Sequence, residues 1–190
     1  MTQFLVDGPA DAQRTFVFAP GAGGPMVSAF MATIARGIAA NGVRVVRFEF
    51  AYMAARKRRP DPQPVLLDTW RSVVREIGNP ERLVIGGKSL GGRMASMVAD
   101  ELNVAGLLCY GYPFHPPGQP DKLRTAHLKN LRTPALIVQG TRDPFGSRDE
   151  VKSYELSSTI SVKWIEGGDH SLKGGLPQAI DFGARFIPSI

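Results

Sequence analysis

The sequence has little of what secreted and membrane proteins require. Its 190 residues contain one cysteine, Cys109, so no internal disulfide can form and a reducing compartment is allowed. Cys109 lies inside an apolar run, where we expect a small buried side chain. No run approaches the roughly 20 apolar residues that a membrane span needs, and the segment 1–14 lacks the apolar core of a signal peptide. These absences predict a cytoplasmic protein without a membrane partner.

Histidine is also scarce. Only three are present, and no Cys, His, Asp or Glu residues are spaced as metal ligands, so we expect neither a metal nor another cofactor. The hydrophobic share of 43% and the charged share of 21% are ordinary for a globular protein. The length predicts a single domain over residues 1–190, large enough for a real core. The oligomeric state stays open.

The formal net charge is +6, and four positive charges are consecutive at Arg56–Arg59. Such a stretch has two interpretations. It is either a site for nucleic acid or an anionic partner, or a solvated loop before a proline-rich turn. We favour the solvated loop, because no aromatic residues alternate with the basic ones to form a stacking surface. A nucleic-acid partner is therefore not expected.

The most informative segment is 82–93, which reads RLVIGGKSLGGR. An apolar run stops at glycines, Ser89 follows between Gly87 and Gly91, and an apolar pattern then resumes. Strand, sharp turn and helix with a serine at the tip fit the G-x-S-x-G nucleophile elbow. A phosphate-binding P-loop would need glycine where Arg82 stands. A turn that merely packs a helix close to a strand remains an alternative until catalytic partners are found.

A dinucleotide-binding fingerprint is also incomplete. Gly21 and Gly23 begin one, but the third glycine is replaced by Met26.

Six short apolar strands are expected to alternate with helices. Strands that are apolar throughout are typical of a parallel sheet covered on both faces, so the sequence predicts an α/β, three-layer α/β/α sandwich with a mostly parallel sheet of about six strands. Arg44 and Arg47 suggest that the second strand is less completely buried. The expected strands are 15–19, 43–50, 83–85, 104–110, 135–138 and 162–165, and the expected helices are 27–38, 66–77, 90–102, 121–128, 147–156 and 176–187.

The serine needs a base, and the base needs an orienting acid. Asp143 follows the strand 135–138, and His170 follows the strand 162–165. The order Ser89, Asp143, His170 is that of an α/β-hydrolase, with each residue after its own strand. Of the other histidines, we expect His115 to line the pocket and His127 to lie at the surface.

Asp169 is a poor orienting acid, because neighbouring side chains in an extended loop point apart. It could instead anchor the loop that carries His170.

An acyl-transfer site also needs donors for the developing oxyanion. One is expected to be the backbone N–H of Leu90, just after the nucleophile. The other is expected from the glycine-rich loop 20–25, at Ala22 or Gly23. Gly23, Lys88 and His115 are further candidates for substrate contacts, and Arg93 for a clamp to a carboxylate or carbonyl.

Together these motifs resemble a branch of small predicted α/β-hydrolases that is similar to dienelactone hydrolases. Eukaryotic relatives of that branch include a subunit of a histone-acetyltransferase (NSL) complex. The resemblance implies an α/β-hydrolase fold with a triad at Ser89, Asp143 and His170. The motifs that carry it are PGAG at 20–23, FEFAYM at 48–53, GGKSLGGR at 86–93, GTRDPFG at 140–146 and GGDHS at 167–171.

Two departures from the wider family matter. Dienelactone hydrolases use a cysteine nucleophile, whereas this elbow carries Ser89, so their substrates do not transfer. The segment 113–131 is too short for a large cap domain, which predicts an open site.

The sequence therefore predicts a serine hydrolase that cleaves a small carboxylic ester or thioester. The alternative is a non-catalytic binding or scaffold protein on a hydrolase fold, suggested by the eukaryotic relative and by Arg56–Arg59.

Overall fold

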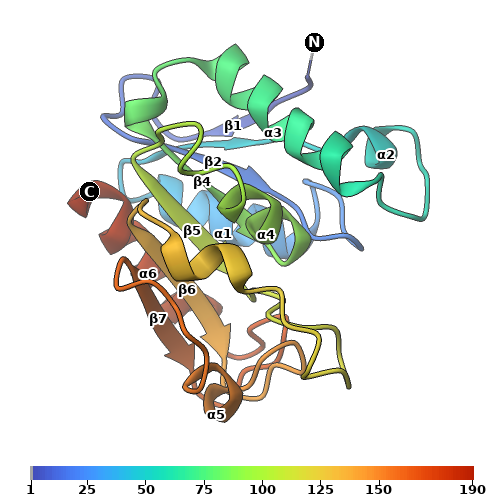
Figure 1. Cartoon of the computed structure of the whole chain (residues 1–190). Coiled ribbons are helices and arrows are strands. Elements are labelled where there is room, and N and C mark those ends of the chain that lie inside the picture. Colours follow the sequence, from blue (N-terminus) through green and yellow to red (C-terminus); the bar gives the residue numbers. More distant parts are fainter. Residues whose placement is uncertain (1) are drawn as a thin grey trace.

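The fold is an open, twisted sheet of seven strands covered by helices, seen in a computed structural model that describes residues 2–190 (Figure 1). The strand order is β1-β3-β2-β4-β5-β6-β7, and every neighbouring pair is parallel except β1 with β3. The mostly parallel α/β sandwich is thereby confirmed. The strands are β1 (Leu5–Asp7), β2 (Thr15–Ala19), β3 (Arg44–Arg47), β4 (Leu83–Lys88), β5 (Gly106–Tyr110), β6 (Ala135–Gly140) and β7 (Ile160–Ile165).

Helices pack on both faces of this sheet. The amphipathic helices α1 and α6 cover one face, while α3, α4 and the 3-10 helix η2 lie over the other (Figure 1). No helix of the described residues is long and apolar enough to cross a bilayer. The helices are α1 (Ala29–Ala39), α2 (Ala51–Ala54), α3 (Gln63–Ile77), α4 (Leu90–Ser96), α5 (Arg148–Val151) and α6 (Leu176–Phe186), with 3-10 turns η1 (Pro80–Arg82), η2 (Ala126–Asn130) and η3 (Ile187–Ser189).

The central strands are buried on both faces, as their unbroken apolar sequences predict. Successive residues of β4 alternate between the two cores: Leu83 and Ile85 face α3 and α4, and Val84 faces α1 and α6. Cys109 of β5 is fully buried, and burial raises the pKa of its thiol well above the usual range. The only thiol of the chain is therefore a core side chain, as expected.

Strand β1 is the element that the sequence did not reveal. It has three residues and pairs antiparallel with β3, Leu5 opposite Arg47. The expectation that Arg47 leaves its strand less buried is wrong, since this side chain is 6% exposed. Its guanidinium donates to Asp7 Oδ2 at 2.8 Å and to Met26 O at 2.7 Å. The edge strand thus supplies the carboxylate that makes a buried arginine tolerable.

Several expected boundaries also need correction. The loop after β3 contains the short helix α2, and Val27 lies before α1 with 63% of its surface exposed. Helix α4 ends at Ser96, well before the expected residue 102. The expected helix 121–128 is the 3-10 turn η2, displaced toward the C-terminus. The capping box of α5 is confirmed, with Ser147 and Glu150 exchanging hydrogen bonds.

The turn between β4 and α4 approaches β2 so closely that two of its positions, Gly87 and Gly91, have no room for a side chain. A Cβ on Gly87 would lie 2.3 Å from the carbonyl oxygen of Ala19, and one on Gly91 would lie 2.6 Å from the same atom. Both contacts are with backbone, which cannot rotate away. These two glycines therefore allow the helix to start directly beside the sheet.

We predict that Gly87→Ala destabilises the protein by about 3 kcal/mol, the upper end of the usual cost of overpacking a core. Gly24→Ala is the matched control, because a Cβ there would have its nearest neighbour at an ordinary 3.7 Å. Urea unfolding of both variants measures the difference. Equal stability of the two variants would show that the β4–α4 turn relaxes at no cost.

Candidate active site

Ser89 stands at the tip of the turn between β4 and α4, in a backbone conformation that few non-glycine residues adopt. Its φ is 47° and its ψ is −112°. The surrounding hydrogen bonds hold this strained geometry: the N–H of Ser89 donates to Tyr110 O at 3.0 Å, and Arg93 N donates to Ser89 O at 3.0 Å. The strand–turn–helix context required of a nucleophile elbow is thus present.

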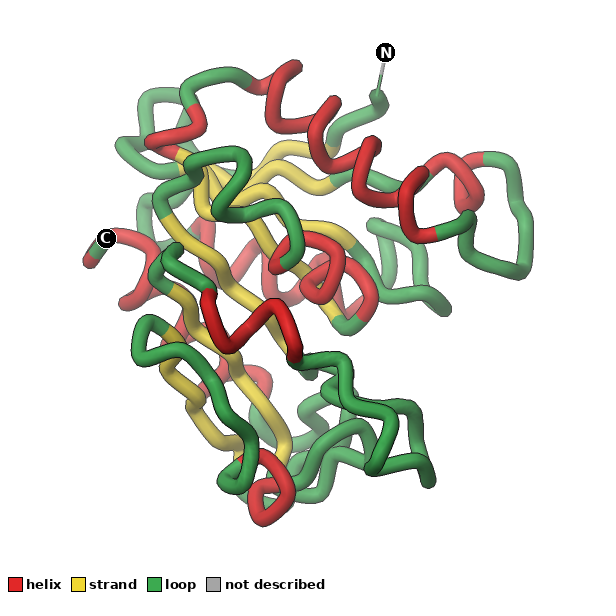
Figure 2. The backbone as a smooth tube through the Cα atoms, in the orientation of Figure 1, coloured by secondary structure: helices red, strands yellow, loops and turns green. Residues whose placement is uncertain are grey.

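The loop after β7 brings an imidazole to this serine. Nε2 of His170 lies 2.9 Å from Oγ of Ser89, within hydrogen-bond reach although 81 positions separate them. The loops that follow β5, β6 and β7 gather at one end of the sheet (Figure 2), because parallel strands all end there. An imidazole nitrogen that could accept the hydroxyl proton is therefore in place beside Ser89.

Asp143 orients that imidazole from the loop after β6. Its Oδ2 lies 2.8 Å from His170 Nδ1, and the residue is 1% exposed. Two further donors reach the carboxylate: the backbone N–H of Phe145 at 2.9 Å from Oδ1, and Gln139 Nε2 at 2.9 Å from Oδ2. An acceptor at Nδ1 places the imidazole proton on that nitrogen and leaves Nε2 free to accept from Ser89.

Two residues of this arrangement were missed by the sequence reasoning. The ring of Phe145 stacks on the imidazole of His170, with centroids 4.1 Å apart. Gln139 is fully buried and joins Asp143 to the chain after β5, since its Oε1 accepts from Tyr112 N at 2.7 Å. A polar residue at the end of an otherwise apolar strand was the available signal for Gln139.

The glycine-rich loop after β2 packs against the nucleophile. A Cβ on Gly21 would touch Cβ of Ser89 at 3.4 Å, and Tyr52 Oη donates to Ala22 O at 3.3 Å. Among the described residues, neither the N–H of Ala22 nor that of Leu90 donates to a protein acceptor. These two groups therefore remain available as oxyanion donors.

An open cavity of about 380 Å³ lies over Ser89 and His170. Its lining includes Ala22 and Gly23 of the glycine-rich loop, and also Lys88. The cavity walls are mainly apolar, formed by α1 and the loop after β6. The remaining lining residues are Gly21, Gly24, Ser28, Phe30, Met31, Phe145 and Ser171.

Comparison with known proteins identifies the family of this chain. Residues 12–177 match the model of a family described as an alpha/beta hydrolase domain, which spans most of the chain. The chain belongs to the α/β-hydrolase family. The site therefore lies where a member of this family carries its chemistry, at the carboxyl ends of the strands.

Solved α/β-hydrolase structures share the fold at low sequence identity. An alpha-beta serine hydrolase homologue from Coxiella burnetii is 22% identical, with 97% of this chain and 90% of that chain covered and a TM-score of 0.79. A serine hydrolase without lid from Xanthomonas campestris is 20% identical, with 97% and 88% covered and a TM-score of 0.76.

A dienelactone hydrolase from Anabaena variabilis is 18% identical, with 99% of this chain and 91% of that chain covered and a TM-score of 0.78. This likeness in fold agrees with the dienelactone hydrolase-like resemblance. The narrower resemblance to the branch of the NSL-complex subunit stays a prediction.

The other two histidines lie apart from Ser89, Asp143 and His170. His115 is 2% exposed and is not among the residues that line the cavity over Ser89. Its Nδ1 lies 2.8 Å from Pro116 O, and its Nε2 lies 3.5 Å from Glu150 Oε1. The structure thus gives His115 a place between two loops rather than in the pocket.

His127 was expected at the surface and is instead half-buried. Its Nε2 lies 2.9 Å from Ser96 Oγ and 3.3 Å from Tyr112 Oη. Burial, with the positive charge of Arg93 in second place, lowers its pKa to about 4. Arg93 itself donates to the amide oxygen of Gln63 at 3.3 Å, so it contacts a carbonyl group as the clamp hypothesis proposed.

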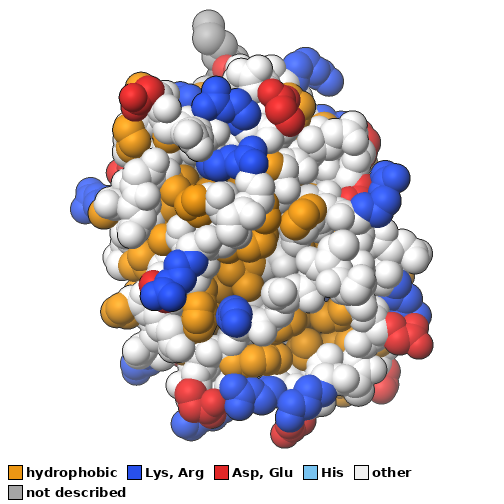
Figure 3. All heavy atoms as spheres, turned by 90° about the vertical axis from the view of Figure 1, so that its left-hand side faces the viewer, with side chains coloured by type: hydrophobic (Ala, Val, Ile, Leu, Met, Phe, Trp, Pro, Cys, Tyr) orange, Lys and Arg blue, Asp and Glu red, His pale blue; other side chains and the backbone are white. Residues whose placement is uncertain are grey.

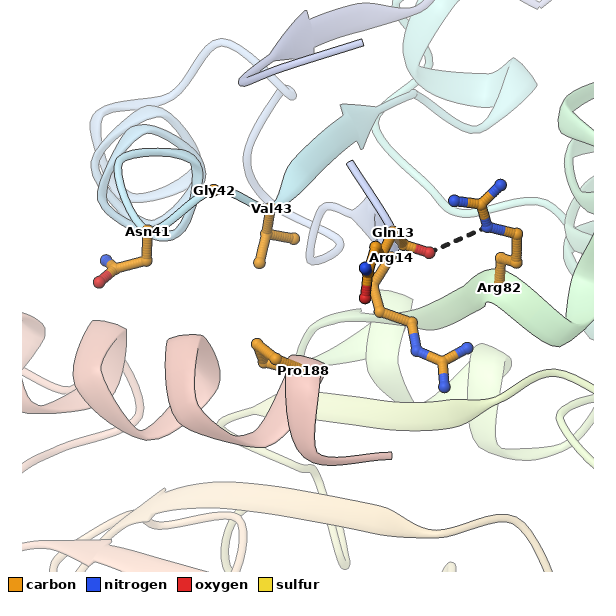
Figure 4. A pocket seen from close by; sticks show the side chains of 7 residues that line it. All are labelled: Gln13, Arg14, Asn41, Gly42, Val43, Arg82 and Pro188. Atoms are coloured by element: carbon orange, nitrogen blue, oxygen red, sulfur yellow. Dashed lines mark hydrogen bonds between the residues drawn. The ribbon is translucent and has the colours of Figure 1, made fainter. Parts of the chain in front are cut away.

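A further hollow, of about 510 Å³, lies at the opposite end of the sheet from Ser89 (Figure 4). The two guanidinium groups that line this hollow, those of Arg14 and Arg82, already donate hydrogen bonds to backbone carbonyls. Arg82 donates to Gln13 O at 3.0 Å and Ala12 O at 3.2 Å, and Arg14 donates to Glu81 O at 2.7 Å. These contacts tie chain segments together at the amino ends of the strands, so we assign this hollow no chemistry.

We predict that Gln139→Leu lowers the free energy of unfolding by about 1–3 kcal/mol, because it leaves the buried Tyr112 N–H without an acceptor and Asp143 Oδ2 without one of its donors. Gln63→Leu, at an exposed position, is the control and should change stability by less than about 0.5 kcal/mol. Urea denaturation measures both. A Gln139→Leu variant as stable as the Gln63→Leu variant would contradict this role.

Proposed function

We propose that the protein is a serine hydrolase that cleaves small carboxylic esters or thioesters through an acyl-enzyme. The observation that carries the proposal is the continuous pair of hydrogen bonds from Ser89 Oγ to His170 Nε2 and from His170 Nδ1 to Asp143. A serine hydroxyl is a weak nucleophile until a base accepts its proton, and this arrangement supplies the base and holds its tautomer. The membership of the α/β-hydrolase family supports the same chemistry.

The proposed reaction follows from these positions. Ser89 Oγ attacks the carbonyl carbon while its proton passes to His170 Nε2. The negative oxygen of the tetrahedral intermediate accepts hydrogen bonds from the N–H groups of Leu90 and Ala22, a contribution worth on the order of 3 kcal/mol for each donor. His170 then protonates the leaving alcohol or thiol, and the acyl group stays on Ser89.

Water completes the cycle. His170 takes a proton from water, the resulting hydroxide attacks the acyl-enzyme, and the proton returns to Ser89 as the acid leaves. Asp143 stays ionised and stabilises the imidazolium that forms in each half-reaction. This chemistry requires no cofactor.

The cavity limits the size of the substrate. A volume of about 380 Å³ with mainly apolar walls suits a short acyl chain or a small aromatic group. Gly23 and Lys88 line it and are the candidates for substrate contacts. A lid is absent from the chain after β5, where residues 111–125 form an irregular loop, so larger leaving groups can extend into solvent.

On one face of the molecule the charges give little support to a nucleic-acid partner. On the face shown in Figure 3, Lys and Arg side chains are scattered among Asp and Glu rather than gathered in one patch. The stretch Arg56–Arg59 is exposed and follows α2, as a solvated loop would. A scaffold role for this stretch is the alternative that the experiment below must separate from catalysis.

We predict that a fluorophosphonate probe labels Ser89 and that short acyl nitrophenyl esters are hydrolysed, whereas Ser89→Ala is neither labelled nor active. Asp143→Asn should lower kcat by about 1,000-fold or more, because it favours the wrong imidazole tautomer. Peptide mapping by mass spectrometry and absorbance assays measure these results.

The control is Asp169→Asn. Oδ1 of Asp169 accepts from Ser171 N at 2.8 Å and from Lys173 N at 3.2 Å, which an asparagine oxygen can replace. Its activity at pH 7, where the Lys88 ammonium keeps its proton, should therefore stay within about threefold of wild type. A folded wild type that neither reacts with the probe nor turns over esters would refute the hydrolase proposal and favour the scaffold role.

A further inference from the structure

The lysine that precedes the nucleophile does not extend freely into the cavity. Lys88 is the last residue of β4, and its Nζ donates a hydrogen bond to the backbone carbonyl of His170, 82 positions away in the sequence. Among the described residues no other group donates to this carbonyl. A single side chain thus connects the strand that carries Ser89 to the main chain of the proposed base.

Residues from β5 and α1 surround the contact between Lys88 Nζ and the His170 carbonyl. Gly111, after β5, has φ of 62°, and a Cβ there would lie 2.6 Å from Lys88 Nζ and 2.8 Å from His170 O. The same Cβ would lie 3.3 Å from His170 Nδ1. From α1, the ring of Phe30 lies under the ammonium, 5.7 Å from Nζ to the centroid. A glycine in the left-handed region and an aromatic face therefore form the space in which the ammonium meets the carbonyl.

The loop that holds His170 has few other restraints on that residue. Gly167 and Gly168 precede it, and Arg142 N donates to Gly168 O at 3.0 Å. Asp169 fixes the residues that follow, through Ser171 N and Lys173 N. A turn in which Leu172 N donates to Asp169 O at 3.0 Å encloses His170, but among the described residues only Lys88 donates to the His170 carbonyl itself.

We propose that Lys88 is a positioning residue whose ammonium holds the His170 main chain where Nε2 can accept the proton of Ser89. The proposal rests on the serine hydrolase function inferred above. It gives Lys88 a role beyond binding a substrate, since one of the three N–H donors of its ammonium is committed to the backbone carbonyl of the base.

The charge of Lys88 should also set an alkaline limit. Burial, opposed by the carboxylates of Asp143 and Asp169, lowers its pKa from 10.5 to about 8. Those two carboxylates and the His170 imidazole are the titratable groups that face it. As the pH rises through 8, the ammonium loses its proton and donates more weakly to the carbonyl. Activity should therefore fall above pH 8.

Stability changes in the opposite direction over the same range. Between pH 8 and 10.5 the unfolded chain binds the Lys88 proton more tightly than the folded chain does, so this group makes folding more favourable as the pH rises. An alkaline loss of activity without a matching loss of stability is the expected signature. Ordinary alkaline unfolding would lower both together.

The test compares Lys88→Met, which keeps the length of the side chain without its charge, with Lys88→Arg, whose guanidinium stays protonated. For a neutral nitrophenyl ester, Lys88→Met should lower kcat by about tenfold to 100-fold, the cost of a small misplacement, with KM unchanged. Its kcat should show no fall near pH 8. Lys88→Arg should recover most of the kcat and move the alkaline fall above pH 9.

A second readout does not depend on turnover. The proton on His170 Nδ1, held by Asp143, should give a low-field ¹H NMR signal that is sharp in wild type and Lys88→Arg but exchange-broadened in Lys88→Met. If wild type lacks esterase activity and this NMR pattern holds, the proposed function fails and the positioning role stands. Lys88→Met with wild-type kcat, pH profile and NMR signal overturns the proposal, and a change in KM alone would assign Lys88 to substrate binding.

Discussion

The close approach of the β4–α4 turn to the end of β2 is the constraint on which the rest of this structure depends. The carbonyl oxygen of Ala19 occupies the space that a Cβ on Gly87 or Gly91 would need. Because this turn can bend so sharply, Ser89 leaves the sheet with its hydroxyl toward the loops. The same approach puts the glycine-rich loop after β2 against the nucleophile, so the two proposed oxyanion donors come from neighbouring strands.

The second constraint is a buried carboxylate. Its removal from water opposes folding, and several hydrogen-bond donors offset this cost. Asp143 is almost fully buried and accepts from His170, Gln139 and the N–H of Phe145. An unpaired carboxylate in this position would oppose folding strongly, whereas one with three donors is tolerated. The amide of Gln139 uses both of its polar atoms here: Nε2 donates to Asp143, and Oε1 accepts from Tyr112 N. The geometry of the proposed triad and the stability of the β5–β6 end of the sheet are thereby linked.

The sequence revealed the elements whose signal is local. The elbow depends on glycines two positions from Ser89, and each further member of the proposed triad follows a short apolar strand. The register of parallel strands then carries these loops to one edge, so their meeting could be foreseen from chain order. Strands β2, β4, β5 and β6 were found because they are apolar on both faces.

What the sequence did not reveal depends on contacts between distant segments. Strand β1 has only three residues and pairs only with β3, where Asp7 also binds Arg47. His127 looked like a surface residue since its partner, Ser96, lies on another helix. The length of α4 was overestimated because its apolar pattern continues past Ser96 into turns that still bury Val98 and Ala99.

The two ends of the sheet differ in which residues adopt a positive φ. Before β4 and β5 these residues are Asn79 and Asn103, a residue type that tolerates the left-handed region. At the amino ends, Arg14 and Arg82 bind carbonyls of neighbouring segments and make the structure more stable. At the carboxyl ends, Ser89 and Leu172 both have positive φ, at 47° and 55°. Leu172 lies two residues after His170, and its side chain is fully buried in the core beneath α6. Burial of a leucine is worth roughly 1.5–3 kcal/mol, enough to offset the 1–3 kcal/mol that a strained residue costs. The loop that carries His170 is thus held at its far side by a hydrophobic anchor and at its near side by Lys88.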